Sequence, residues 1–211
     1  MKYRESIVED AKEYQKLYGH LPNTQEELVK YLIKENKVST EDINSMLKKE
    51  SEIPWLSFHL ALQVHPYPTP RPRVLSNGMT YVRGAKKHRK LIKEYIDNAD
   101  IIYTKTYFTV KTFQVMPKDV NKKEAILFEM GVYQPLIDPD WDNLGKTYSD
   151  MVQNILLIND NIIVKGSIEK YCSIKPRVEI DIEYQQSFDC KFNERRVTRT
   201  KSYQSLLKEK G

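Results

Sequence analysis

The chain has 211 residues and a formal net charge of +5, and 40% of its residues are apolar while 30% are charged. This length and composition are typical of one soluble globular domain with an accessory piece. The longest aliphatic run, residues 155–158, is too short to span a bilayer, and the charged residues 1–10 contain no signal-peptide core. We therefore expect a cytoplasmic protein with no membrane partner. Cys172 and Cys190 lack metal-ligand spacing, and a disulfide framework is not indicated.

Residues 1–50 are predicted to form a small all-helical extension. Thr24 and Glu27 form a capping box for one helix, and Ser39 or Thr40 begins another. Nine Lys or Arg against ten acids leave this segment nearly neutral, so it lacks the basic face of a DNA-reading module. Two interpretations stay open: a module that docks a protein partner or supports a dimer, and a helical cap on the main domain.

Residues 56–97 are expected to contain a strand, an extended loop, a hairpin and a helix. The four prolines of residues 66–73 exclude a central strand, and residues 74–82 are predicted to form a hairpin that turns on Asn77-Gly78. In the alternating strand, the side chains expected to face inward are Leu56, Phe58, Leu60, Leu62 and Val64. In the helix over residues 85–97, they are Leu91, Ile92, Tyr95 and Ile96.

Positive charge is concentrated in two segments. Residues 66–95 carry eight Lys or Arg against one Glu, and residues 188–211 carry seven against three. Such clusters are typical of surfaces that hold a polyanion, although solvated surface charge explains either cluster alone equally well. The second segment shows no clear periodicity, and we expect an arm that orders on DNA or on a partner subunit. The predicted phosphate contacts are Arg71, Arg73, Arg83, Lys86, Lys87, Arg89, Lys90 and Lys93.

The remaining pattern completes an α+β fold, with a mixed β-sheet packed with helices. Further strands are predicted over residues 104–115, 162–173 and 177–184, and a short helix over residues 121–130. The last two strands are expected to pair with each other around Lys175-Pro176. The predicted organisation is a helical extension at 1–50, a main domain at 51–187 and a basic tail at 188–211.

Aspartates occupy alternate positions from Asp138 to Asp142, directly before a helical pattern. Carboxylates this close repel one another unless a proton or a cation lies between them, and a divalent metal is the simplest explanation. The apolar residues that follow predict roughly four turns of helix, which end near Asn159. At ~1.5 Å per residue, a straight helix would hold Asp142 and Asp160 more than ~20 Å apart. The chain must therefore fold back after Leu157 if Asp160 is to join the first acids.

A calcium loop or a simple helix cap accounts for less of this motif than a divalent metal site does. An EF-hand that begins at Asp138 would put Asn143 where the turn needs Gly and Ser149 where a bidentate Glu is required. Helix capping explains one or two aspartates but neither Lys146 nor Asp160. The sequence contains no Cys/His zinc pattern, its four His are too scattered for an HNH-type site, and no PD-(D/E)xK motif is completed downstream. Oxygen-only ligands favour Mg²⁺ or Mn²⁺.

The order D-x-D-N-L-x-K, then a helix, then an Asp in a short polar turn before a strand resembles the RusA-type Holliday junction resolvases, found in phages and prophages. The resemblance extends from residue 68 to residue 184. It departs from the family at Asn159-Asp160, where the family has a pair of aspartates and only the second carboxylate is kept here. The matched residues are Asp140, Asp142, Asn143, Leu144, Lys146, Asp150 and Asp160.

The resemblance implies a RusA-like homodimer that hydrolyses phosphodiesters in branched DNA, in recombination and repair. Asp140, Asp142 and Asp160 are expected to bind one or two Mg²⁺, with Mn²⁺ as a substitute. Lys146 is expected to stabilise the extra negative charge of the transition state or to protonate the leaving group.

Three further polar residues are expected to support this site. Asn143 would orient a ligand carboxylate or cap the helix, Asp150 would hold Lys146 in place, and Asp138 would be an outer acid without a family counterpart. Two other functions stay open: a branched-DNA-binding protein of the same fold that cuts poorly or not at all, and a Mg²⁺-dependent phosphoesterase acting on a small nucleotide.

Overall fold

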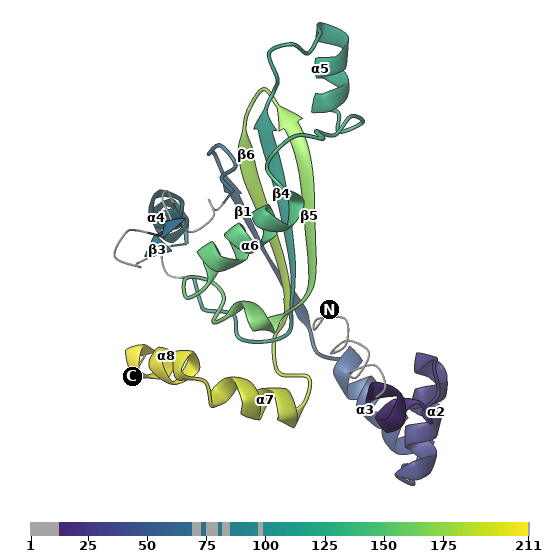
Figure 1. Cartoon of the computed structure of the whole chain (residues 1–211). Helices are drawn as coiled ribbons and strands as arrows, with labels where there is room; N and C mark the ends of the chain where they lie inside the picture. Colours follow the sequence, from purple (N-terminus) through teal and green to yellow (C-terminus); the bar gives the residue numbers. More distant parts are fainter. Residues whose placement is uncertain (1–12, 69–72, 75–79, 82–84, 97–98, 211) are drawn as a thin grey trace. The chain divides into compact units, whose positions relative to one another are not determined.

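The computed structural model describes residues 13–68, 73–74, 80–81, 85–96 and 99–210 (Figure 1). The chain divides into two compact units, Met1–Glu52 and Ile53–Gly211. Within the described ranges, no helix combines the length and apolar character needed to cross a membrane.

The described part of the first unit is helical, as the sequence predicted. α2 (Gln25–Glu35) follows Thr24, whose hydroxyl accepts a hydrogen bond from the Glu27 amide at 3.3 Å. α3 (Thr40–Ser51) is capped in the same way by the hydroxyl of Ser39, at 3.0 Å. Neither helix buries a side chain. The large apolar side chains that are exposed on these helices are Val29, Leu32, Met46 and Leu47.

The second unit is built on a four-stranded mixed sheet, which confirms the predicted α+β class. The strand order is β1-β6-β4-β5. β6 is antiparallel to both of its neighbours, while β4 and β5 are parallel. The bounds are Trp55–Leu62 for β1, Thr106–Val115 for β4, Ile163–Ser173 for β5 and Arg177–Gln185 for β6.

The predicted pairing of the last two strands is wrong, because β4 lies between β5 and β6. Val115 at the end of β4 pairs with Ser173 of β5, and Phe113 pairs with Arg177 of β6. The three residues 174–176 therefore cross the end of β4. Neighbouring strands are about 4.8 Å apart and an extended residue spans ~3.3 Å, so this short connection can bridge two strand spacings.

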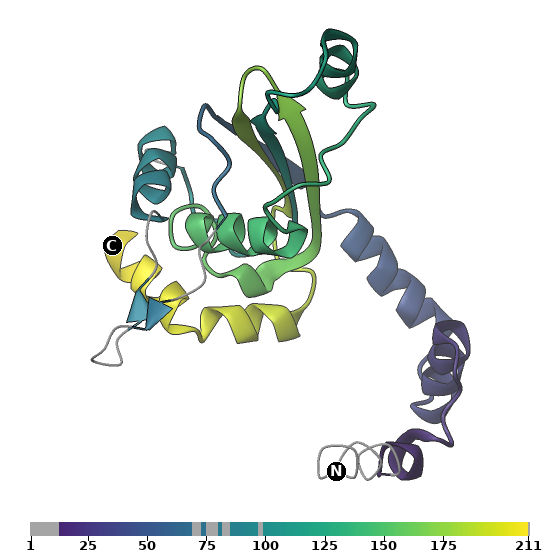
Figure 2. The same cartoon turned by 45° about the horizontal axis from the view of Figure 1, so that its top comes forward.

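The core lies between the sheet and two helices, α4 (Ala85–Tyr95) and α6 (Trp141–Val152). α6 packs against β5, and α4 packs against α6 (Figure 2). Ile92 of α4 and Ile96 directly after it are buried as predicted, but Tyr95 is 59% exposed. Leu56 at the start of the edge strand β1 is likewise exposed, although the alternation holds farther along. The buried side chains of the core include Leu60, Leu62, Phe108, Val110, Leu144, Tyr148, Val152, Val178, Ile180 and Ile182.

Two smaller elements also agree with the sequence. α5 (Lys122–Glu129) has a capping box at Asn121. β2 (Arg73–Val74) pairs antiparallel with β3 (Thr80–Tyr81). The predicted turn at Asn77-Gly78 lies outside the described residues.

The C-terminal segment is helical, although its sequence shows no clear periodicity. The segment forms α7 (Lys191–Thr198) and α8 (Lys201–Lys210). The Tyr203 ring meets the Tyr103 ring edge-on, with the centroids 5.4 Å apart. The tail side chains that pack against the core are Val197, Tyr203 and Leu206. These few apolar residues fix the helices, although charged neighbours hide their periodicity in the sequence.

A polar cluster spans three strands on the other face of the sheet. Nδ1 of His59 lies 2.6 Å from Oδ1 of Asp181, and Nζ of Lys111 donates to Oδ2 of Asp181 at 3.2 Å. Burial opposes ionisation of Asp181, but the hydrogen bonds from His59 and Lys111 outweigh it and hold the pKa of Asp181 below its usual value. The hydrogen bond to Asp181 raises the pKa of Lys111.

We expect Asp181→Asn to lower the free energy of unfolding at neutral pH by at most about 1 kcal/mol, because partly exposed ion pairs contribute little more. The folded-state pKa of Asp181 is depressed, so its contribution is present above the unfolded-state pKa of about 3.9 and disappears as pH falls through the folded-state value. Urea unfolding at neutral pH and near pH ~2.5 measures this difference. A gap between wild type and variant that stays the same at acidic pH would contradict it.

Candidate active site

The acidic motif lies at the start of α6. Asp140 is the N-cap residue, yet its side chain makes no capping hydrogen bond, and Asp142 lies in the first turn. Both carboxylates are exposed, and neither has an ion-pair partner among the described residues. The helix dipole favours negative charge at this end. Because capping does not engage these oxygens, they remain available to a ligand.

α6 lies very close to β5 at Gly145. A Cβ atom at this position would overlap Cδ1 at the end of the Ile168 side chain. Nε1 of Trp141 donates a hydrogen bond to the Ile168 carbonyl at 2.9 Å. Gly in a helix interior costs about 1 kcal/mol relative to Ala, and the Ile168 side chain here fills the space that an Ala Cβ would need.

The chain turns back earlier than predicted, because α6 ends at Val152. Gln153 is extended, and Asn154 has φ 60°, a left-handed conformation that Asn adopts more readily than most residues. The Ile158 amide then donates to the Ile102 carbonyl at 2.9 Å, which ties the returning chain to the segment before β4. The predicted four-turn helix with a fold-back at its end is therefore corrected to a helix of 12 residues with an earlier return.

This return brings Asp160 to the same pocket as Asp142 and Lys146. Asn159 caps the 3₁₀ helix η1 (Asp160–Ile162) by accepting a hydrogen bond at 3.0 Å from the amide two residues on. The carboxylate of Asp160 is exposed beside this cap. We call the resulting cavity, of about 340 Å³ between α6 and the start of β5, the carboxylate pocket.

Asp138 and Asp140 line a neighbouring pocket of about 610 Å³. The two cavities share Trp141 and Ile168, so they adjoin along the α6–β5 contact. The peptide bond between Asp138 and Pro139, which leads into the helix, is cis.

The carboxylates expected to converge are thus divided between two adjoining pockets, with Asp142 and Asp160 in one and Asp140 in the other. Within the described part of the chain, no three Asp, Glu, His or Cys side chains are arranged to hold a metal ion. The side-chain oxygens that line the carboxylate pocket belong to two carboxylates, Asp142 and Asp160, and to the hydroxyls of Ser149 and Ser167. This oxygen-only set fits Mg²⁺ or Mn²⁺, because such ions keep several water ligands.

Lys146 provides positive charge at the carboxylate pocket. The expected ion pair with Asp150 is not formed, and no described residue pairs with the Lys146 ammonium. Asn143 is half-buried and accepts a hydrogen bond from the Thr147 hydroxyl through its backbone carbonyl, at 2.6 Å. Lys146 is therefore a cation that is available to a bound anion.

The predicted phosphate contacts before α4 are only partly described. Arg71 and Arg83 lie outside the described residues. Arg73 belongs to β2, and Lys86 and Lys87 lie in the first turn of α4.

The rest of the basic helix has more specific contacts. Arg89 donates a hydrogen bond to the Gln153 carbonyl at 2.9 Å, which links α4 to the C-terminal end of α6. Lys90 lies 3.6 Å from Glu94, and Lys93 is exposed. Arg89 thus has a structural role that its charge alone did not indicate.

Tyr148 has a second role that its place in an apolar stripe concealed. Its hydroxyl accepts a hydrogen bond from the Tyr67 amide at 3.0 Å, and burial raises the pKa of Tyr148 to about 12. The contact ties the start of the proline-rich loop to α6. The sequence offered one indication of this contact, because a buried Tyr usually has a hydrogen-bond partner for its hydroxyl.

Comparison with known proteins assigns this architecture to a class of DNA-cutting enzymes. The family model of the endodeoxyribonuclease RusA matches residues 63–183, more than half of the chain. The chain belongs to the RusA endodeoxyribonuclease family, which confirms the resemblance seen in the sequence. It is also 31% identical to the uncharacterized protein YqaN of Bacillus subtilis (strain 168) over 122 residues, which cover 53% of this chain and 85% of that protein. Family membership supports an endonuclease that acts on Holliday junctions.

We expect Gly145→Ala to act differently in two backgrounds. In an Ile168→Ala background, Ala should raise the free energy of unfolding by about 0.5–1 kcal/mol through helix propensity. In the wild-type background this gain should be lost or reversed, because the new Cβ displaces Ile168. A double-mutant cycle in urea measures the coupling. Equal gains in both backgrounds would show that the helix and the strand are not in tight contact.

Proposed function

We propose that this protein is a Mg²⁺-dependent endodeoxyribonuclease that resolves four-way or other branched DNA junctions by paired nicking. The observation that carries the proposal is that Asp142, Lys146 and Asp160 line one pocket in a chain of the RusA family. Asp142 and Asp160 are 18 positions apart in sequence, and the return of the chain after α6 brings both to this pocket.

Asp142 and Asp160 would hold the cation, and Asp140 would add its carboxylate from the adjoining pocket. When bound, the metal supplies an activated water and neutralises charge at the scissile phosphate. Mg²⁺ needs oxygen ligands and retains water, which suits an exposed pair of carboxylates better than an enclosed cage.

Lys146 would act on the phosphodiester itself. It lies on α6 one turn beyond Asp142, and its ammonium has no partner among the described residues. A free cation at this place stabilises the additional negative charge of the transition state, or donates a proton to the leaving 3′ oxygen. The same charge in the ground state would help to seat the phosphate.

DNA binding would involve the basic side of α4. Lys93 is exposed and Lys90 is engaged only in a surface ion pair, which costs little to exchange for a phosphate. Because a four-way junction requires two symmetric cuts, we propose that the protein acts as a homodimer. The exposed apolar side chains of α2 and α3 would bind a protein partner or support that dimer.

We expect Asp142→Asn and Asp160→Asn each to reduce cleavage of a labelled four-way junction by several orders of magnitude, because each removes a metal-binding carboxylate. Junction binding without divalent metal should persist or improve, because one negative charge leaves a DNA-facing pocket. Cleavage is measured with Mg²⁺ on the junction and on linear duplex.

The matched control for these variants is Asp119→Asn, an exposed aspartate in the loop before α5. It makes the same change of charge away from the pocket and should cut as wild type does. Undiminished cutting by the Asp142 or Asp160 variant would remove that residue from the chemistry. Absence of cutting by the wild-type protein, with tight junction binding, would favour the binding-only function.

Lys146→Ala should slow cleavage by ~10²-fold or more, as the loss of other electrostatic stabilisers does, and should change junction affinity much less. Lys123→Ala on α5 is the control, since it removes one exposed lysine distant in sequence from the motif. Single-turnover kinetics with saturating enzyme separates the chemical step from binding. An unchanged single-turnover rate would assign Lys146 to structure alone.

A further inference from the structure

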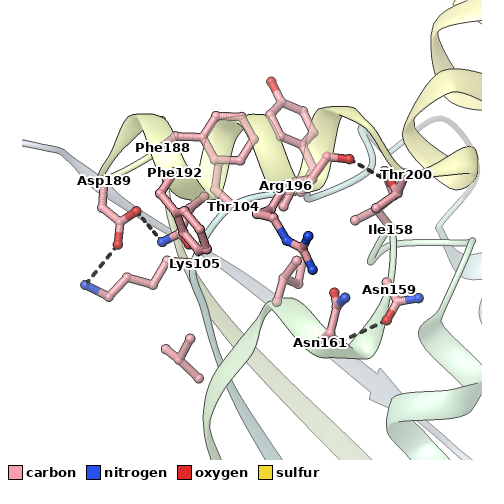
Figure 3. A pocket seen from close by; sticks show the side chains of 15 residues that line it. Thr104, Lys105, Ile158, Asn159, Asn161, Phe188, Asp189, Phe192, Arg196 and Thr200 are labelled. Atoms are coloured by element: carbon pink, nitrogen blue, oxygen red, sulfur yellow. Dashed lines mark hydrogen bonds and ion pairs between the residues drawn. The ribbon is translucent and has the colours of Figure 1, made fainter.

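A third cavity, of about 370 Å³, lies against α7 (Figure 3). One wall comes from the segments before β4 and β5, and includes Thr104, Asn159 and Asn161. The other wall comes from α7 and the residues leading into it, and includes Phe188, Phe192 and Arg196. We call this cavity the α7 pocket. Its volume falls within the ~300–1,000 Å³ typical of small-ligand pockets.

The walls combine aromatic rings with amides. The rings of Phe188 and Tyr103 lie 5.6 Å apart between centroids, and Phe192 is 63% exposed beside them. Across the cavity are the side chains of Asn159 and Asn161 (Figure 3). Aromatic faces that stack on a base and amides that bond its edges are the usual elements of single-strand recognition.

Arg196 gives the α7 pocket an available positive charge. Figure 3 shows its guanidinium pointing from α7 toward the Asn159–Asn161 turn, and no described residue pairs with it. The neighbouring charges are already engaged, since Asp189 lies 4.0 Å from Nζ of Lys105 and accepts a hydrogen bond from Asn193 at 2.8 Å. An anionic group in this pocket would therefore meet Arg196.

The α7 pocket adjoins the carboxylate pocket through one short turn. Asn159 and Asn161 line the first, while Asp160 between them lines the second. Ile162 and Val164 continue the wall of the α7 pocket, and Ile163 that of the carboxylate pocket. The same short stretch of chain, residues 159–164, therefore borders both pockets.

We propose that the α7 pocket takes up one unpaired nucleotide of the DNA strand that passes over the carboxylate pocket. Its base stacks on Phe188 and Phe192, and its phosphate pairs with Arg196. This inference rests on the proposed function. α7 lies beyond residues 63–183, the range that the RusA family model matches, so one wall of the pocket comes from outside the matched range.

The test is a double-mutant cycle in which one change is an abasic residue in the DNA and the other is Phe192→Ala in the full-length protein. Four-way junctions carry a single abasic residue, moved in turn across the nucleotides at the branch point, and affinity is measured without divalent metal so that no strand is cut. For wild type, one position should lower affinity by about 10-fold or more, as expected when one stacked base is lost. Phe192→Ala should bind the intact and the abasic junction equally.

Arg196→Ala, compared with Arg195→Ala, is a second and independent arm. Nε of Arg195 donates to the Lys191 carbonyl at 3.2 Å, and Arg195 does not line the pocket, so it offers the same loss of charge in the same helix. Arg196→Ala should weaken junction binding more than Arg195→Ala does.

Tyr14→Ala, which removes a ring that is 65% exposed in the other unit, is the control for Phe192→Ala. Thermal unfolding of each variant checks the fold.

Three results would overturn the proposal. The first is an abasic scan without a sensitive position, and the second is a sensitive position that Phe192→Ala leaves unchanged. The third is binding of a free mononucleotide as tight as that of the junction, which would make the cavity a small-ligand site. Failure of the nuclease function would be visible separately, as absence of Mg²⁺-dependent cutting of the intact junction by wild type.

Discussion

The contact between α6 and β5 at Gly145 is the constraint on which the site depends. The Ile168 side chain of β5 occupies the space that a side chain at Gly145 would need, and the Trp141 hydrogen bond to the Ile168 carbonyl ties the helix to the strand. Asp142 and Lys146 lie on the two sides of this glycine in sequence. They are therefore presented over the start of β5, which is where the returning chain places Asp160.

Burial of the opposite face of α6 keeps this arrangement in place. Leu144, Tyr148 and Val152 are fully buried. Rotation of the helix would expose their apolar surface to water, which costs about 25 cal/mol of free energy per Å². The return of the chain is fixed by backbone hydrogen bonds to Ile102. Polar residues of the site thus remain exposed while the residues that position them are among the most buried of the chain.

Sequence patterns predicted the helices and strands correctly where residues close in sequence determined the structure. Alternation located β1, its content of Thr, Tyr, Phe and Val located β4, and the capping box at Thr24 located α2. They failed where a contact distant in sequence decided the result. Nothing local to residues 174–176 indicates that β4 lies between β5 and β6, and nothing before Asn154 shows that α6 ends at Val152. For the site, the pattern D-x-D-N-L-x-K identified the residues, but the division of the carboxylates between two pockets depends on three-dimensional packing.

The most direct test of metal binding is a crystal structure of the protein grown with Mn²⁺, whose anomalous scattering locates the ion without reference to any activity. We expect an ion in the carboxylate pocket with oxygen ligands from both Asp142 and Asp160, at the short distances of a hard divalent cation. An ion bound away from Asp160, or a carboxylate pocket without metal at millimolar Mn²⁺, would contradict the central claim that these two carboxylates share a cation.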